Sequence, residues 1–317
     1  MKQRENIGVL GANYWGSKLV RVSNKLGYSV TVVDPQASVR NRIRNEYPDV
    51  RILPSPSPVF NDETIPTLFI ATPSSTHFAL AQEALHHKKH VFVEKPMTLS
   101  STETQTLISL QKKSGTRLMV DHTYMYSAAL EKAKQAISNG KIGKVISVDS
   151  FRMGPGTVRA DSSVLWDLAP HDISIGMYLF GHEPDSQHLF SPKAYIRNHR
   201  QYAFYTLHFG AVPMTCVVSW VFPRKVRTLL IRGSSGMIEI SWEGPTENLM
   251  IYKRKKDRVQ FEHGILVKTI SQEPLERALR HFFTCIRLHT IPLSDAVHAK
   301  KVIRVIEKLE SGEKHIQ

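Results

Sequence analysis

The sequence contains a lysine whose position suits proton transfer. Lys95 stands in Glu94-Lys95-Pro96, directly after an apolar run at 90–93. An amine at the carboxyl end of a parallel strand lies where such sheets bind ligands, and it can protonate or hydrogen-bond a substrate oxygen, more readily when burial lowers its pKa. Lys95 is therefore a candidate catalytic group. Taken alone, the position is more often that of a surface lysine before a proline-bounded loop.

A second candidate group lies in Trp166-Asp167-Leu168-Ala169-Pro170-His171-Asp172. If this segment is helical, Asp167 and His171 are four positions apart and share a face. A histidine held by a carboxylate suits proton transfer near neutral pH. Pro170 is unfavourable inside a helix unless the helix begins near it or is kinked there. A structural histidine is the alternative, and we expect no metal site, because no further ligands with recognisable spacing accompany these residues.

A glycine-containing loop, Gly11-Ala12-Asn13-Tyr14-Trp15-Gly16, follows the first apolar run. It matches the dinucleotide-binding pattern G-x-G-x-x-G except that Asn13 replaces the middle glycine. Asparagine tolerates a left-handed backbone, but its side chain takes space where the pyrophosphate approaches. The two remaining glycines permit the tight turn and the close helix–strand contact, and backbone N–H groups at the helix start would meet the phosphates.

An acidic residue at the end of the second apolar run supports the nucleotide interpretation. Asp34 lies 23 positions after Gly11, where a carboxylate hydrogen-bonds the hydroxyls of the adenosine ribose. The same carboxylate would repel the extra phosphate of NADP, so NAD(H) is favoured. Arg40 lies nearby and leaves NADP(H) open. The alternative is an ordinary glycine turn and a strand-end aspartate in a domain that binds no nucleotide.

The elements around these residues predict two different architectures. Up to about residue 120, short apolar strands alternate with helical patterns, which is typical of a parallel sheet with crossover helices. The predicted strands are 6–10, 29–34, 67–72, 90–96 and 117–122, with helices at 14–26, 75–87 and 102–114. The strands are continuously apolar, which indicates burial on both faces. The proline-rich run at 54–58 predicts a rigid turn or an extended segment.

After residue 120 the pattern changes to strands that follow one another closely, which favours an antiparallel sheet. Helices are expected at 127–140, 163–180, 274–288 and 295–310. We therefore predict an α/β protein with a Rossmann domain at 1–120 and a second α/β domain at 121–317. The second domain should carry an open, mostly antiparallel sheet for substrate binding and oligomerisation.

Composition limits the classes of protein that fit. The chain has 317 residues and a formal net charge of +14. The charge is spread evenly, with 15 basic and 9 acidic residues in 1–120 and 27 and 19 in the rest, unlike the basic tail or helix of a nucleic-acid binder. An anionic substrate is compatible with the excess. Two cysteines, no signal peptide and no long apolar run lead us to expect a cytoplasmic protein without a membrane span.

Six segments stand in a recognisable order along the chain. They are GANYWG at 11–16, Asp34, ATPSSTH at 71–77, VEKP at 93–96, DHTYMY at 121–126 and WDLAPHD at 166–172. Together they resemble the glucose–fructose oxidoreductase / inositol dehydrogenase / MocA (Gfo/Idh/MocA) family over nearly the whole chain. The bacterial members that act on sugar nucleotides or amino sugars are the most similar group.

The resemblance implies NAD(P)-dependent hydride transfer at a hydroxyl-bearing carbon of a sugar, amino sugar or nucleotide sugar. It makes Lys95 the group that contacts the reacting oxygen, with Asp167 and His171 as the pair at the substrate carbon. The implied cofactor-binding residues are Gly11, Asn13, Tyr14, Trp15, Gly16, Asp34, Thr72, Pro73, His77 and Glu94. The implied substrate-binding residues are Tyr124, Tyr126 and Arg159.

Three features depart from the family pattern: Asn13, Asp121 where close relatives often carry glycine, and the proline-rich stretch from about 54 to 66. None removes a predicted catalytic group. A non-catalytic regulator that senses a nucleotide or sugar on the same scaffold remains the alternative, since fold alone does not fix function. We further expect a small-molecule partner, no nucleic acid, and a homo-oligomer, either a dimer or a tetramer.

Overall fold

The computed structural model describes residues 5–156, 163–191, 195–196, 199–244, 246–255, 260–270, 272–312 and 314–315. The chain divides into two compact units. One comprises Met1–Asp121 with Leu275–Ile303, and the other comprises His122–Pro274 with Arg304–Gln317. The segment Leu275–Ile303 therefore belongs to the first unit, whereas the sequence prediction placed everything after residue 120 in one domain.

The first unit contains a six-stranded parallel sheet with the order β3-β2-β1-β4-β5-β6. The strands are β1 (Asn6–Leu10), β2 (Ser29–Val33), β3 (Arg51–Leu53), β4 (Thr67–Ile70), β5 (His90–Glu94) and β6 (Leu118–Asp121). The central strands β1, β4 and β5 are almost fully buried, which explains their continuous apolar sequences. The strand order reverses between β1 and β4, so their carboxyl ends form the switch point at which open α/β sheets bind ligands.

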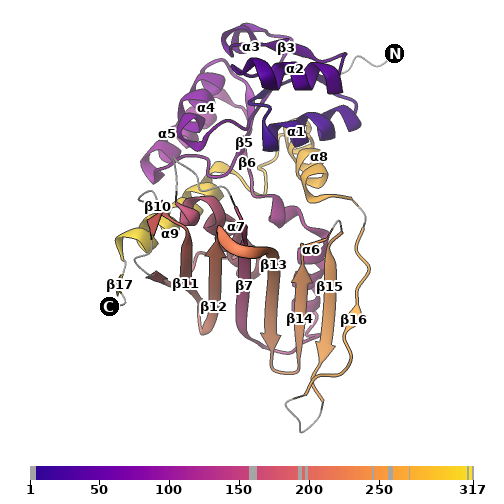
Figure 1. The fold of residues 1–317 in the computed structure, drawn as a ribbon, viewed down its shortest axis with the longest axis vertical. Coiled ribbons are helices and arrows are strands. Elements are labelled where there is room, and N and C mark those ends of the chain that lie inside the picture. Colours follow the sequence, from indigo (N-terminus) through magenta and orange to yellow (C-terminus); the bar gives the residue numbers. More distant parts are fainter. Residues whose placement is uncertain are drawn as a thin grey trace. The chain divides into compact units, whose positions relative to one another are not determined.

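The helices of this unit flank the parallel strands in Figure 1. They are α1 (Tyr14–Lys25), α2 (Ala37–Glu46), α3 (Ser57–Asn61), η1 (Ser74–Thr76), α4 (His77–His86), α5 (Ser101–Ser114) and α8 (Pro274–Arg287). The proline-rich run leads into the short helix α3, whose N-cap is Pro56, so the expectation of only a turn or an extended segment is incomplete. Proline suits a helix start, where its missing N–H is not needed.

Aromatic packing explains why α8 belongs to the first unit. Phe282 and Phe283 pack against Phe69 of β4, with ring centroids 6.4 and 6.0 Å apart. Phe282 also lies 5.7 Å from Phe92 of β5, and Phe283 stacks on Tyr28 at 4.1 Å. The apolar side of α8 thus completes the core over these two strands.

The second unit is built on a nine-stranded sheet with the order β16-β15-β14-β13-β7-β12-β11-β8-β17. Its strands are β7 (Val145–Pro155), β8 (Ser186–Ser191), β11 (Tyr202–Phe209), β12 (Val212–Ser219), β13 (Val221–Gly233), β14 (Gly236–Ser241), β15 (Asn248–Lys253), β16 (Ile265–Leu266) and β17 (Lys314–His315). The pairs β7–β12 and β8–β17 are parallel and the others antiparallel. Separately, β9 (Tyr195–Ile196) pairs antiparallel with β10 (His199–Arg200).

Helices cover one face of this sheet (Figure 1). They include η2 (Thr123–Tyr126), α6 (Ala128–Ser138) and α7 (Val164–Phe180), and α9 (Ala296–Ser311) passes from the first unit into the second. Along β11 every second side chain is buried, and the alternate ones are partly exposed. This alternation is expected for a sheet with one covered face. Within the described residues, no helix has both the length and the apolar character needed to cross a bilayer.

The helix that carries Asp167 and His171 is continuous through Pro170. It begins at Val164, six residues before the proline, so it does not start near Pro170 as one alternative proposed. The four-residue spacing of Asp167 and His171 therefore lies on one helix, as predicted.

Candidate functional site

Two glycines shape the loop between β1 and α1. Gly11 has φ +81°, and a Cβ atom there would lie 2.7 Å from the carbonyl oxygen of Ala71. A Cβ atom on Gly16 would lie 1.8 Å from the carbonyl oxygen of Gly11. Both distances are below any normal contact, so the turn and the close approach of α1 each require glycine.

Asn13, the residue in place of the middle glycine, is the N-cap of α1 with φ −74°. The loop therefore uses no left-handed backbone at this position, and the tolerance of asparagine for that conformation is not needed. The first turn of α1 contains no acidic residue, which leaves its positive dipole end available to an anion. Lys18 lies above the rings of Tyr14 and Trp15, at 4.4 and 4.3 Å from their centroids.

Asp121 has a definite partner in this loop. The indole Nε1 of Trp15 donates a hydrogen bond to Oδ2 of Asp121 at 2.8 Å, and Asp121 is fully buried. The aspartate that departs from the family pattern thus connects the end of β6 to the first turn of α1. Sequence reasoning did not anticipate this pairing, which spans 106 positions.

Asp34 holds the same loop from the end of β2. Its Oδ2 accepts a hydrogen bond from the Ala12 N–H at 2.9 Å, and its Oδ1 accepts one from the Gln36 N–H at 2.9 Å. Arg42 donates to the carbonyl oxygen of Ala12 at 2.7 Å, so both the N–H and the carbonyl group of Ala12 are hydrogen-bonded. A carboxylate has about four lone-pair sites, so Asp34 retains acceptor capacity for hydroxyl groups. Arg40 donates to the Asp34 carbonyl oxygen at 2.9 Å.

The loop after β4 lies beside the glycine loop, because the Ala71 N–H donates to the Leu10 carbonyl oxygen at 2.8 Å. His77 is buried at its end and links two strand ends. Its Nδ1 lies 2.8 Å from the Pro96 carbonyl oxygen and its Nε2 lies 2.8 Å from the Thr72 carbonyl oxygen. His77 therefore fixes the residues next to Pro73 and Lys95. Glu94 and Lys95, at the end of β5, are both partly buried.

In the second unit, Asp167 and His171 contact aromatic side chains. Oδ2 of Asp167 accepts a hydrogen bond from the indole Nε1 of Trp220 at 2.8 Å. The imidazole of His171 makes an edge contact with Tyr124, with centroids 5.0 Å apart. Tyr126, the other predicted pocket tyrosine, is buried. Arg159, predicted to reach an anionic part of the substrate, lies outside the described residues.

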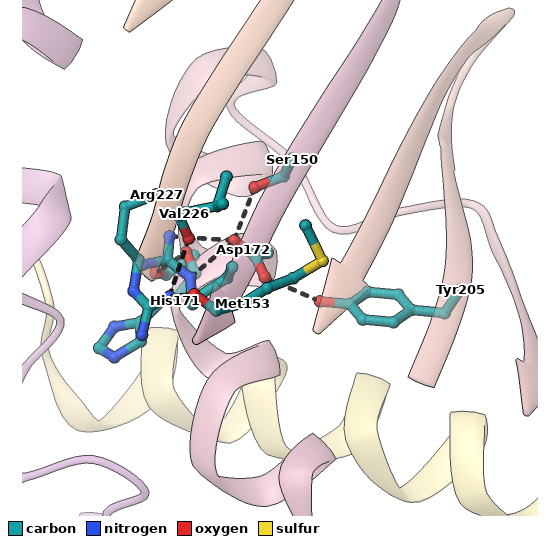
Figure 2. A network of polar contacts seen from close by, with 9 residues as sticks. Ser150, Met153, His171, Asp172, Tyr205, Val226 and Arg227 are labelled. Carbon is teal, nitrogen blue, oxygen red and sulfur yellow. Dashed lines mark hydrogen bonds and ion pairs between the residues drawn. The ribbon is translucent and has the colours of Figure 1, made fainter. Parts of the chain in front are cut away.

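Sequence reasoning missed a buried ion pair next to His171. Oδ1 of Asp172 lies 3.0 Å from both Nε and Nη2 of Arg152 and accepts a hydrogen bond from the Ser150 hydroxyl at 2.8 Å. The Tyr205 hydroxyl donates to Oδ2 of Asp172 at 3.3 Å. Figure 2 shows Arg227 and His171 at one end of this network and Tyr205 at the other. No sequence pattern indicated this pair: only the structure shows that Arg152 lies on the buried side of β7 together with Ser150 and Val148.

The charges in this network act on one another. Burial by itself lowers the pKa of Arg152, but the adjacent Asp172 carboxylate outweighs it, so the net direction is upward. Burial, and secondarily the cation of Arg152, lowers the pKa of Arg227. Burial raises the pKa of both Tyr205 and Cys216, each fully enclosed near Asp172. Within the described ranges, no three His, Cys, Asp or Glu side chains are grouped as metal ligands would be.

Comparison with known proteins finds two family models on this chain. The model of an oxidoreductase family with an NAD-binding Rossmann fold, GFO_IDH_MocA, matches residues 5–122, and the model of the GFO/IDH/MocA C-terminal domain matches residues 130–239. The first match covers the parallel sheet with its glycine loop. The second covers the helix carrying Asp167 and His171.

Curated relatives include dehydrogenases of different specificity. The UDP-N-acetylglucosamine 3-dehydrogenase of Acidithiobacillus ferrooxidans is 25% identical over 93% of this chain and 93% of its own length. A solved structure of that enzyme superposes with a TM-score of 0.85 at 21% identity, covering 98% of each chain, which supports the fold. Two inositol dehydrogenases of Bacillus subtilis match about half of their length: scyllo-inositol 2-dehydrogenase (NAD(+)), 29% identical over 58% of this chain and 56% of its own, and scyllo-inositol 2-dehydrogenase (NADP(+)) IolW, 24% identical over 55% and 51%.

Proposed function

The chain belongs to the GFO/IDH/MocA oxidoreductase family with its NAD-binding Rossmann fold, and from that premise we propose that it oxidises or reduces a sugar. The proposed reaction transfers a hydride between a nicotinamide cofactor and a hydroxyl-bearing carbon of a sugar, amino sugar or nucleotide sugar. The relatives that carry such activities in their names support this substrate class.

The observation that carries the proposal is the structure of the loop after β1 and of the neighbouring end of β2. Gly11 and Gly16 leave the loop after β1 without side chains where any Cβ would collide with backbone, and the buried carboxylate of Asp34 lies beside it. This combination fits a dinucleotide: backbone N–H groups for the pyrophosphate and a carboxylate for the ribose hydroxyls. We propose that Asn13, Tyr14, Trp15, Thr72, Pro73, His77 and Glu94 complete the cofactor site.

We propose NAD(H) as the preferred cofactor. The carboxylate of Asp34 would accept hydrogen bonds from both ribose hydroxyls and would repel a phosphate at the same position. Relatives named for NAD(+) and for NADP(+) both occur, so the preference rests on this residue rather than on the family. Arg40 does not neutralise the carboxylate directly, since it donates to backbone carbonyls of Asp34 and Pro35.

In the proposed mechanism, protein side chains move the hydroxyl proton. During oxidation, Nε2 or Nδ1 of His171 would accept the proton, with Asp167 stabilising the imidazolium that forms. The Lys95 ammonium would hydrogen-bond the substrate oxygen and stabilise negative charge on it. When bound, the nicotinamide supplies the hydride acceptor or donor. Reduction reverses the proton transfers.

A turnover screen tests this function. The protein is incubated with NAD⁺ or NADP⁺ together with one sugar class at a time: inositols, hexoses, amino sugars or nucleotide sugars. Formation of the reduced cofactor is followed by its absorbance. We expect turnover with at least one of these classes, lost in a His171→Ala variant that still binds cofactor. Cofactor binding without turnover on any class, in both directions, would instead support the sensing regulator.

We also propose a cytoplasmic homo-oligomer, either a dimer or a tetramer, with no nucleic-acid partner. The partly exposed side chains on the uncovered face of the nine-stranded sheet, such as those alternating along β11, support self-association. Light scattering of the purified protein measures its mass.

A DNA-binding assay tests the expected absence of a nucleic-acid partner. DNA retention that is weak, salt-sensitive and independent of sequence would agree with a dispersed positive charge.

A further inference from the structure

The ion pair of Asp172 and Arg152 lies in the interior of the second unit. Both side chains are almost completely enclosed, at 0% and 1% exposure. One carboxylate connects three elements, because Asp172 belongs to α7, Arg152 and Ser150 to β7, and Tyr205 to β11. The turn of α7 that carries His171 is therefore fixed to the sheet by the residue that immediately follows it.

The guanidinium of Arg152 has a second contact on the side of His171. Its Cζ lies 4.2 Å from the ring centroid of Tyr124, which is the distance of a cation–π contact. The same tyrosine ring makes edge contacts with His171 at 5.0 Å and with Trp242 at 4.9 Å. The contacts thus form a continuous series from Asp172 through Arg152 and Tyr124 to the imidazole of His171.

A gain in stability alone does not explain why this ion pair is buried. Removing two charges from water is costly, and well-packed apolar side chains of the same volume are often as stable as a buried ion pair. A planar guanidinium can hold a carboxylate with two N–H groups and lie flat against an aromatic ring at the same time. Lysine and apolar residues cannot do both.

We propose that the Asp172–Arg152 ion pair positions the ring of Tyr124 and, through it, the imidazole of His171, which makes Arg152 a positioning residue for the acid–base group. This inference rests on the proposed function, because it assigns His171 the proton-transfer role. It concerns the orientation and proton affinity of His171 and leaves the identity of the sugar open.

The sign of the electrostatic effect follows from the charges around His171. The charged residues that act on one another here are Asp167 and Asp172 of α7, Arg152 of β7 and Arg227 of β13. Burial raises the pKa of both Tyr205 and Cys216, so neither adds a charge near pH 7. Arg152→Met leaves the Asp172 carboxylate uncompensated, which favours the imidazolium and raises the pKa of His171. Asp172→Asn leaves the Arg152 cation uncompensated and lowers that pKa. We expect each substitution to shift this pKa by about one pH unit.

The test measures the pKa of His171 directly by NMR titration of the histidine ring signals, assigned with a His171→Asn variant. We expect an upward shift in Arg152→Met, a downward shift in Asp172→Asn, and a pKa near that of the wild type in the double variant. Arg152→Lys removes the guanidinium that contacts both Asp172 and the Tyr124 ring but keeps the charge, so the pKa of His171 should change little in this variant. All four variants should lose kcat by roughly 10²-fold, as expected when a reacting group is misplaced.

Arg232→Met is the matched control, because Arg232 of β13 also pairs with an aspartate, Asp149 of β7, but is 44% exposed. It should change neither the pKa of His171 nor kcat. Circular dichroism and thermal melting identify variants that fail to fold. If the single charge-removing variants unfold, Arg152→Lys carries the test, because its kcat should fall while the pKa of His171 changes little.

Equal shifts of the same sign in the two single variants, or no shift in either, would overturn the proposal. Wild-type kcat in Arg152→Lys would overturn its positioning part. The NMR readout requires no turnover, so a protein without sugar activity that still shows the opposite shifts would refute the proposed function and leave the electrostatic coupling intact.

Discussion

Two consecutive residues of α7, His171 and Asp172, have different roles in the proposed site. Asp172 is buried and bonded to Arg152, Ser150 and Tyr205, whereas the imidazole of His171 contacts Tyr124. A carboxylate enclosed with its cation fixes the backbone, and the neighbouring imidazole is the proposed proton acceptor. The sequence Pro170-His171-Asp172 therefore combines an anchoring residue with a proposed acid–base residue.

Lys95→Ala tests the second proposed proton-transfer group. We expect the dissociation constant for NADH to stay within about twofold, because the side chain is assigned to the substrate oxygen. Turnover should fall by ~10²–10⁴-fold, the usual contribution of general acid–base help. Steady-state kinetics and cofactor fluorescence measure the two effects. Lys112→Ala, on the exposed side of α5, is the control, and turnover of Lys95→Ala near the wild-type rate contradicts the assignment.

Asp34 determines the expected cofactor preference. Titrating the protein with NADH and with NADPH should give a lower dissociation constant for NADH. Asp34→Asn removes the repulsive charge and keeps an oxygen that can accept from the Ala12 N–H, so the difference between the two cofactors should shrink. Tighter binding of NADPH by the wild-type protein would show that Arg40 and Arg42 outweigh the carboxylate.

At the scale of elements, the backbone geometry of the glycine loop leads to a third prediction. Gly16→Ala places a Cβ atom within 1.8 Å of the Gly11 carbonyl oxygen, so α1 must move away from β1. We expect cofactor affinity to fall by at least 10-fold and the melting temperature to decrease. Gly244→Ala, at an exposed glycine that is not among those with a positive φ, is the control, since a Cβ there lies 3.7 Å from its nearest neighbour, the Thr246 carbonyl oxygen. Cofactor binding unchanged in Gly16→Ala would contradict the loop assignment.

Local sequence patterns predicted the elements that are determined by residues close in sequence. The continuous apolar runs gave the central strands β1, β4 and β5, and the spacing of Asp167 and His171 gave one face of α7, since these features depend on residues close in sequence. Short elements such as β3 and α3 carry too few residues for a periodic signal. The contacts Trp15–Asp121 and Arg152–Asp172 join residues 106 and 20 positions apart, and no local pattern encodes such pairs.

At the scale of the whole molecule, buried histidines predict how stability depends on pH. Burial, with smaller contributions from Arg117 and His289, lowers the pKa of His90 from 6.5 to about 4, and burial likewise lowers that of His298 to about 4. Both residues lie in the first unit. The unfolded chain binds more protons between pH 6.5 and pH 4, so the free energy of unfolding must decrease as the pH falls through this window.

Denaturant unfolding at pH 7.5, 5.5 and 4.5 measures this dependence. His90 accepts a hydrogen bond from the Arg117 N–H through Nδ1 at 2.9 Å, and glutamine can accept the same bond without titrating. His90→Gln should therefore lose less stability between pH 6.5 and pH 4 than the wild-type protein. His86→Gln, exposed on α4, should follow the wild type. Equal pH dependence in all three proteins would show that His90 does not contribute.

The division of the first unit between two distant segments has a consequence for its synthesis. Met1–Asp121 leaves the ribosome first, but Phe69 and Phe92 lack Phe282 and Phe283 until α8 has been translated. At about 5–20 residues per second, the intervening chain takes roughly 8–30 s to make. During this interval the nascent nucleotide-binding half exposes an aromatic surface, to which chaperones that bind apolar segments have access.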